Sequence, residues 1–166
     1  MTLTGMWVWD LMKLADYIIS LPFCNKDTLS SVGFSGGGMQ SLWLAALDEQ
    51  IRKVVVSGYY HSYRGTILRT NQCGCNFVPH LYEYADIGDI GALIAPRPLL
   101  IETGDQDFLN GERGIADVID QVDITREGYE IVGAKEKLKH QIYHGEHKWY
   151  GSDVIAWIAM PCTYEN

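Results

Sequence analysis

Basic residues are scarce in this chain of 166 residues, which has 13 lysines and arginines against 21 aspartates and glutamates. The resulting formal net charge of -8 argues against nucleic acid or an anionic membrane as the main partner and suits a neutral, uncharged substrate. No apolar stretch is long enough to span a membrane, because Asp10, Lys13 and Asp16 interrupt the most apolar early segment. No basic segment precedes an apolar run, so the sequence predicts no signal peptide and favours a cytoplasmic protein.

Cysteines are also few, and their spacing indicates neither a disulfide framework nor a metal site. Cys73 and Cys75 are separated by one residue, which is too close for a relaxed disulfide between them. A zinc site would need C-x-x-C spacing and a second ligand pair, for which His61 and His80 are only loose candidates. We therefore expect no metal, no cofactor and free thiols at all four positions, which are Cys24, Cys73, Cys75 and Cys162.

The composition is that of one ordinary globular domain, with 47% hydrophobic and 20% charged residues. A chain of this length buries roughly two-thirds of its unfolded surface and needs no second domain. Internal repeats and low-complexity tracts are absent. The sequence therefore predicts a single domain over residues 1–166.

Strand-like and helix-like segments alternate along that domain. Short apolar, β-prone runs predict strands over residues 28–34, 51–57, 99–103 and 137–143, the first of them buried on both faces. Helical patterns cover residues 6–21, 39–47, 87–95, 111–132 and 152–160. Residues 58–86 have no clear periodicity, as is typical of a segment that shapes or covers a site. This alternation predicts an α/β fold with a parallel sheet of about four strands, flanked by helices.

The segment Gly33-Phe34-Ser35-Gly36-Gly37-Gly38-Met39 lies between an expected strand and an expected helix. It matches the G-x-S-x-G nucleophile elbow, a sharp turn that lifts a serine hydroxyl clear of the sheet. Glycines two residues on either side of Ser35 allow the strand and the helix to approach closely. The backbone N–H of Gly36, at the positive end of that helix, is a candidate oxyanion donor. Phosphate-binding alternatives fail, because the lysine of a P-loop and the spacing of a dinucleotide site are both missing.

Two later loops carry the partners that a nucleophilic serine needs. In a parallel sheet, the loops that leave the carboxyl ends of the strands meet at one edge. These loops hold Ser35, then Asp105 or Asp107, then His144 or His147, which is the chain order Ser, acid, His of α/β-hydrolases. The histidine takes the serine proton during attack and returns it to the leaving alcohol, while the carboxylate fixes the imidazole tautomer.

The sequence resembles the α/β-hydrolase superfamily, and within it the acetyl xylan esterase-like and dienelactone hydrolase-like enzymes. In that group the acid is the aspartate that closes G-x-x-D, here Asp107, and the histidine follows a Gly-x pair, here His147. The resemblance thus implies the triad Ser35, His147 and Asp107, with Asp105 and His144 as runners-up. It is carried by the elbow and by residues 5–10, 45–49, 73–79, 92–100 and 145–147.

The resemblance also implies a serine esterase that cleaves small acetyl-type esters through an acyl-enzyme. Five aromatic or imidazole side chains after strand ends are candidates for a pocket wall, or for ordinary packing: Tyr59, Tyr60, His61, Trp149 and Tyr150. The alternative is a truncated or degenerate half-domain that serves in assembly or binding, with little catalysis. A peptidase or thioesterase would share the same machinery.

Family members carry about as much chain again before the helix that opens this one. By resemblance, that part holds the first strands of the sheet and the loop with the second oxyanion donor. Its absence leaves the strand over residues 29–34 as a sheet edge, which favours association unless it is covered. We therefore expect a homo-oligomer in which another copy covers this edge.

Overall fold

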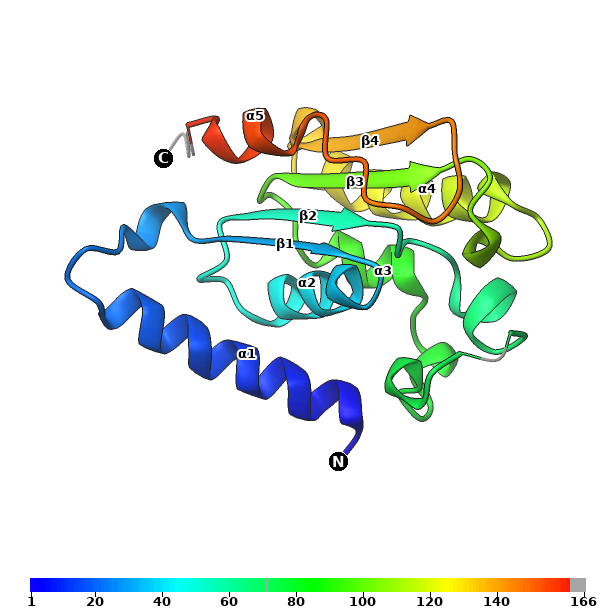
Figure 1. Cartoon of the computed structure of the whole chain (residues 1–166), viewed down its shortest axis with the longest axis horizontal. Coiled ribbons are helices and arrows are strands. Elements are labelled where there is room, and N and C mark those ends of the chain that lie inside the picture. The colour runs from blue at the N-terminus through cyan, green and yellow to red at the C-terminus, as the bar shows by residue number, and fades with distance from the viewer. Residues whose placement is uncertain (71, 162–166) are drawn as a thin grey trace.

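The computed structural model describes residues 1–70 and 72–161, and Cys162 lies outside these ranges. Its centre is a parallel sheet of four strands in the order β1-β2-β3-β4, so that strands consecutive along the chain are neighbours in the sheet (Figure 1). The strands are β1 (Ser30–Phe34), β2 (Lys53–Ser57), β3 (Leu99–Gly104) and β4 (Leu138–Tyr143). This confirms the predicted fold class, and each strand lies within two residues of its predicted range.

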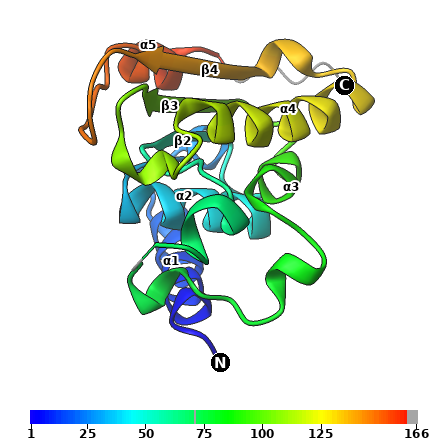
Figure 2. The ribbon, with the colours of Figure 1, turned by 90° about the vertical axis from the view of Figure 1, so that its right-hand side faces the viewer.

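Five α-helices connect or flank the described strands: α1 (Leu3–Ser20), α2 (Gly36–Leu47), α3 (Ile87–Ala92), α4 (Ile115–Ile131) and α5 (Val154–Ala159). The buried core residues place α1 to α4 on one face of the sheet and α5 on the other, and Figure 2 shows α5 next to β4 at the top of the view. Side chains that alternate along a strand face opposite sides. Val54 and Val56 accordingly belong to the large core between the sheet and α1 to α4, whereas Val55 packs with Trp157 of α5 on the opposite face.

The two central strands are fully buried, and the two outer strands are not. The prediction that the first strand is buried on both faces is wrong, since Val32 of β1 is 39% exposed. The physical reason is the position of β1 at the edge of the sheet, where α5 covers Val55 and Leu100 of the central strands but not Val32. The predicted edge position of this strand is confirmed.

In its described residues, the irregular segment after β2 contains three short helical turns, at Tyr63–Ile67, Gly74–Asn76 and Leu81–Glu83. It begins at the carboxyl edge of the sheet, where β1, β3 and β4 also end (Figure 1). Tyr60 and Ile67 of this segment are buried in the main core. The segment is therefore packed structure that can form the wall of a site. Among the described residues, no helix is long and apolar enough to cross a membrane.

Candidate active site

The turn between β1 and α2 holds Ser35 in a strained conformation. Its φ of 54° and ψ of -120° lie in a region that side-chain-bearing residues rarely adopt, and its N–H donates to the carbonyl of Ser57 at 2.8 Å. A Cβ on Gly33 would lie 2.0 Å from the carbonyl oxygen of Gly37, and one on Gly38 would lie 2.8 Å from that of Ser57. A Cβ on Gly37 would meet nothing within 4 Å. The close approach predicted for this turn therefore depends on Gly33 and Gly38.

The hydroxyl of Ser35 is joined to a histidine and a carboxylate from two other strand ends. Ser35 Oγ lies 2.9 Å from Nε2 of His147, and Nδ1 of His147 lies 2.7 Å from Oδ2 of Asp107. Oδ1 of Asp107 accepts the N–H of Leu109 at 2.9 Å, so both carboxylate oxygens have a partner. The structure thus brings the three predicted side chains into one hydrogen-bonded line.

This line is shielded from water on the carboxylate side. The side chain of Asp107 is 1% exposed and that of His147 is 18% exposed. The imidazole lies near two aromatic rings, with centroid distances of 4.6 Å to Phe34 and 5.8 Å to Phe108. These neighbours restrict the rotation of the imidazole and leave its Nε2 facing Ser35.

The runner-up residues form a separate pair at the surface. Nδ1 of His144 lies 3.1 Å from Oδ2 of Asp105, and the His144 side chain is 79% exposed. Asp105 also accepts the N–H of Gly145 at 3.0 Å, and this bond together with His144 lowers the pKa of the Asp105 carboxyl. Within the described part of the chain, no hydrogen bond joins this pair to Ser35.

A small cavity of about 220 Å³ opens beside the Ser35 hydroxyl. Gly36 lines it as the first residue of α2, and the N–H groups of the first turn of a helix have no partner within the helix. The remaining lining residues come from the irregular segment and from the loop after Asp107: Tyr59, Gln72, Cys73, Cys75, Asn76 and Leu109. The cavity is therefore lined by both Ser35 and the N-terminus of α2.

The five candidate wall residues have different surroundings. Tyr59 lines the cavity beside Ser35, and burial raises the pKa of its hydroxyl, which keeps it neutral. Tyr60 and His61 are buried, and burial lowers the pKa of His61 to about 4. Trp149 and Tyr150 are 43% and 44% exposed. Of the five residues, Tyr59 is the one that the structure places in this cavity.

Sequence reasoning missed Glu102, a fully buried carboxylate in the middle of β3. Its Oε1 accepts the N–H of Gly151 at 3.1 Å, in the same loop as His147. Burial raises the pKa of this carboxyl. The sequence did carry a signal for this role, which is a charged residue inside an otherwise apolar strand. The hydrogen bond from Gly151 to Glu102 fixes the position of the loop that carries His147.

The loosely suggested metal ligands do not assemble. Among residues 1–70 and 72–161, no group of three or more His, Cys, Asp and Glu side chains is arranged to hold a metal ion. His80 instead lies at the surface, with its Nδ1 2.6 Å from Glu83.

The strained serine turn follows β1 of the parallel sheet, the carboxylate of Asp107 follows β3 and the imidazole of His147 follows β4. This arrangement defines the α/β-hydrolase fold. No model of a known protein family matches the chain. A protein of Bacillus subtilis named "Putative hydrolase YtaP" is 31% identical over 115 residues, which are 67% of this chain and 38% of that protein.

Solved structures share the same fold. A carbohydrate esterase family 15 glucuronoyl esterase from Caldicellulosiruptor kristjansonii superimposes with a TM-score of 0.73 at 22% identity, over 92% of this chain and 47% of that chain. A Bacteroides fragilis protein described as "a putative acetyl xylan esterase" gives a TM-score of 0.69 at 20% identity, over 84% and 36% of the two chains. The chain thus has the α/β-hydrolase fold and spans less than half the length of these proteins.

Proposed function

We propose that this chain is a serine hydrolase that cleaves small, acetyl-type carboxylic esters. The observation that carries the proposal is the hydrogen-bonded line from Ser35 through His147 to Asp107, with distances of 2.9 Å and 2.7 Å. The fold supports it, because similar chains include proteins named as esterases of carbohydrates.

The proposed reaction uses the same groups in both half-reactions, acylation and deacylation. Ser35 Oγ attacks the ester carbonyl while Nε2 of His147 takes its proton, and buried Asp107 stabilises the imidazolium. The N–H of Gly36 donates to the oxyanion that forms. The imidazolium then returns the proton to the leaving alcohol oxygen. A water molecule, deprotonated by the same imidazole, then attacks the acyl-enzyme. As the bond between the acyl carbon and Ser35 Oγ breaks, the imidazolium returns the proton to Oγ, which releases the carboxylic acid and restores the Ser35 hydroxyl.

The size of the cavity beside Ser35 supports a small acyl group. Its volume of about 220 Å³ is below the roughly 300 to 1,000 Å³ typical of sites for drug-sized ligands. Tyr59 and Leu109 contribute apolar surface to its wall, and Gly36 contributes the start of α2. An acetyl group would fit with its oxygen toward the start of α2.

The test compares hydrolysis of p-nitrophenyl acetate by the wild type and by Ser35→Ala. We expect kcat/KM to fall by about ten-thousandfold, because the loss of one member disables the whole triad. Labelling with a fluorophosphonate provides a second measurement, since it requires an activated hydroxyl but no turnover. Equal rates and equal labelling of the two proteins would refute the esterase and favour the alternative, a half-domain with a role in assembly or binding.

A further inference from the structure

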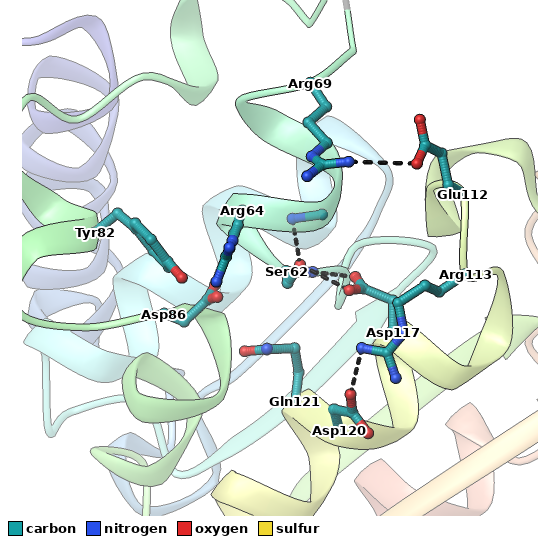
Figure 3. A pocket seen from close by; sticks show the side chains of 11 residues that line it. Ser62, Arg64, Arg69, Tyr82, Asp86, Glu112, Arg113, Asp117, Asp120 and Gln121 are labelled. Atoms are coloured by element: carbon teal, nitrogen blue, oxygen red, sulfur yellow. Dashed lines mark hydrogen bonds and ion pairs between the residues drawn. The ribbon is translucent and has the colours of Figure 1, made fainter.

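The cavity beside Ser35 has two cysteines in its wall, Cys73 and Cys75. A larger cavity of about 400 Å³, between residues 62–69 and the start of α4, is lined mainly by charged side chains, and no cysteine is among its described lining residues (Figure 3). Cys24, the other cysteine that the structure describes, lines neither cavity. Two of the four cysteines therefore meet next to the proposed nucleophile, and the proposed hydrolysis gives them no role.

The two thiols contact each other and have different surroundings. Cys73 is exposed, whereas Cys75 is buried at 7% exposure. Hydrogen bonds from the backbone N–H and from the thiol of Cys75 lower the pKa of the Cys73 thiol. Burial, together with the hydrogen bond to Cys73, raises the pKa of the Cys75 thiol to about 11. An exposed thiol that ionises readily, next to a second thiol, is typical of cysteines that undergo reversible oxidation.

Neighbouring side chains hold Cys75 in place and connect both cysteines to another wall of the cavity. The hydroxyl of Thr4 in α1, a residue that is 4% exposed, donates to the carbonyl of Cys75. The side-chain NH₂ of Asn76 donates to Cys75 Sγ at 3.6 Å and to the carbonyl of Cys73 at 3.1 Å. Oδ1 of Asn76 accepts the hydroxyl of Tyr59 at 2.7 Å. Asn76 therefore joins both cysteines to Tyr59, which lines the same cavity.

A disulfide between these two cysteines would reshape this wall. The sulfur atoms of a disulfide are about 2.05 Å apart, which is much closer than two thiols that share a hydrogen bond. Because Thr4 fixes the backbone of Cys75, the exposed Cys73 has to move, and Asn76 transmits the movement to Tyr59. The spacing of one residue is too close for a relaxed bridge. A strained disulfide is readily reduced again, so the change would be reversible.

We propose that Cys73 and Cys75 form a modification site at which a hydroperoxide oxidises the two thiols to a disulfide and thereby slows hydrolysis at Ser35. The effect on hydrolysis rests on the proposed esterase function, whereas the oxidation itself does not. The cavity beside Ser35 has a volume of only about 220 Å³, so a displaced wall leaves less room for the acyl group. Reduction of the disulfide restores the wall and the reaction.

The oxidation takes two steps and consumes one molecule of peroxide. The thiolate of Cys73 attacks one oxygen of hydrogen peroxide, so that an S–O bond forms, the O–O bond breaks and hydroxide leaves. Cys75 then loses its proton, and its sulfur attacks the sulfur of Cys73 while the S–O bond breaks and a second hydroxide leaves. The two hydroxide ions take the two thiol protons and become water. The two thiols thus lose two electrons to the peroxide, and the products are one disulfide and two water molecules.

The first test follows the thiols and needs no esterase activity. The wild type is treated with hydrogen peroxide, the remaining thiols are blocked with N-ethylmaleimide, and the tryptic peptides are weighed. Trypsin cuts after Arg69 and Arg113 but not after Arg97, which precedes proline, so one peptide holds this cysteine pair without Cys24 or Cys162. That peptide should lose two hydrogen atoms and take up no N-ethylmaleimide, while the peptides with Cys24 and Cys162 remain labelled. An unchanged peptide, or equal oxidation of Cys24, would overturn the proposal.

The second test compares kcat/KM for p-nitrophenyl acetate before and after peroxide treatment, within each protein. In the wild type, kcat/KM should fall about ten- to a hundredfold, because a displacement of roughly 1 Å near reacting atoms can cost the larger factor, and dithiothreitol should restore it. In Cys73→Ser the peroxide should not change kcat/KM. In Cys75→Ser the peroxide should lower kcat/KM without recovery, because Cys73 is then oxidised further to the sulfinic acid.

The two tests separate failure of this proposal from failure of the esterase. A disulfide with unchanged kcat/KM, or an equal loss of kcat/KM in Cys73→Ser, would refute the control of hydrolysis by this site. A disulfide in a wild type that does not cleave p-nitrophenyl acetate would support the modification site and refute the proposed function.

Discussion

The replacement Asp107→Asn tests the proposed triad with the least change in shape. Oδ1 of Asp107 accepts the N–H of Leu109 at 2.9 Å, whereas Oδ2 faces Nδ1 of His147 at 2.7 Å. In the variant, the backbone N–H of Leu109 must face the amide oxygen, so the amide NH₂ faces His147. The imidazole must then accept at Nδ1 and carry its proton on Nε2. Nε2 can no longer take the proton of Ser35.

The expected loss is large because the wrong tautomer blocks the proton transfer itself. Placing the imidazole in this tautomer typically costs about ten-thousandfold in kcat. That factor corresponds to about 5 kcal/mol of transition-state stabilisation. The measurement is kcat/KM for p-nitrophenyl acetate, with thermal unfolding to show that the variant is folded.

The chain provides its own control in the second Asp–His pair. Asp105→Asn makes the same chemical change two residues away, in the exposed pair with His144. It should retain the wild-type rate within a few-fold. A rate for Asp107→Asn within tenfold of the wild type, or an equal loss in Asp105→Asn, would show that the hydrogen-bonded line does not perform the reaction.

Three further results are expected. Gly33→Ala should lower the free energy of unfolding by about 3 kcal/mol, because the new Cβ would lie 2.0 Å from the carbonyl oxygen of Gly37. In the control Gly37→Ala the new Cβ would meet nothing within 4 Å, so this free energy should not fall, and equal melting temperatures of the two variants would contradict the reasoning. As pH falls from 6.5 to about 4, the unfolded chain binds a proton at His61 that the folded chain does not. The free energy of unfolding of the protein should therefore fall by about 3 kcal/mol because of His61 alone. Urea unfolding of His61→Phe should show a smaller pH slope, with the contribution of His140, whose pKa is also about 4, retained; an unchanged slope would refute the assignment. We propose that a second copy of the chain covers the sheet edge at Val32 of β1. Light scattering at micromolar concentration should then show an oligomer that Val32→Lys weakens, and a monomeric wild type would refute this proposal.

The sequence by itself determined the order and approximate limits of the strands and helices. Buried parallel strands such as β2 and β3 are apolar on both faces, so their runs stand out without knowledge of their neighbours. The elbow was equally local, because a serine in a strained turn needs glycine where the backbone of the next helix approaches, as at Gly33. The edge position of β1 followed from the resemblance, although the exposure of Val32 did not follow from its apolar pattern.

Only the tertiary structure decided which side chains meet. Asp105 and Asp107 are two residues apart, and from residue types alone either could serve as the acid. The turn after Asp107 buries its carboxylate against the N–H of Leu109 and the ring of His147, whereas Asp105 binds Gly145 at the surface. The cavity of about 400 Å³ between residues 62–69 and the start of α4 was likewise invisible in the sequence, because it forms only where these distant segments pack together. Contacts between loops that are distant in sequence depend on how the whole chain packs, and local patterns do not encode them.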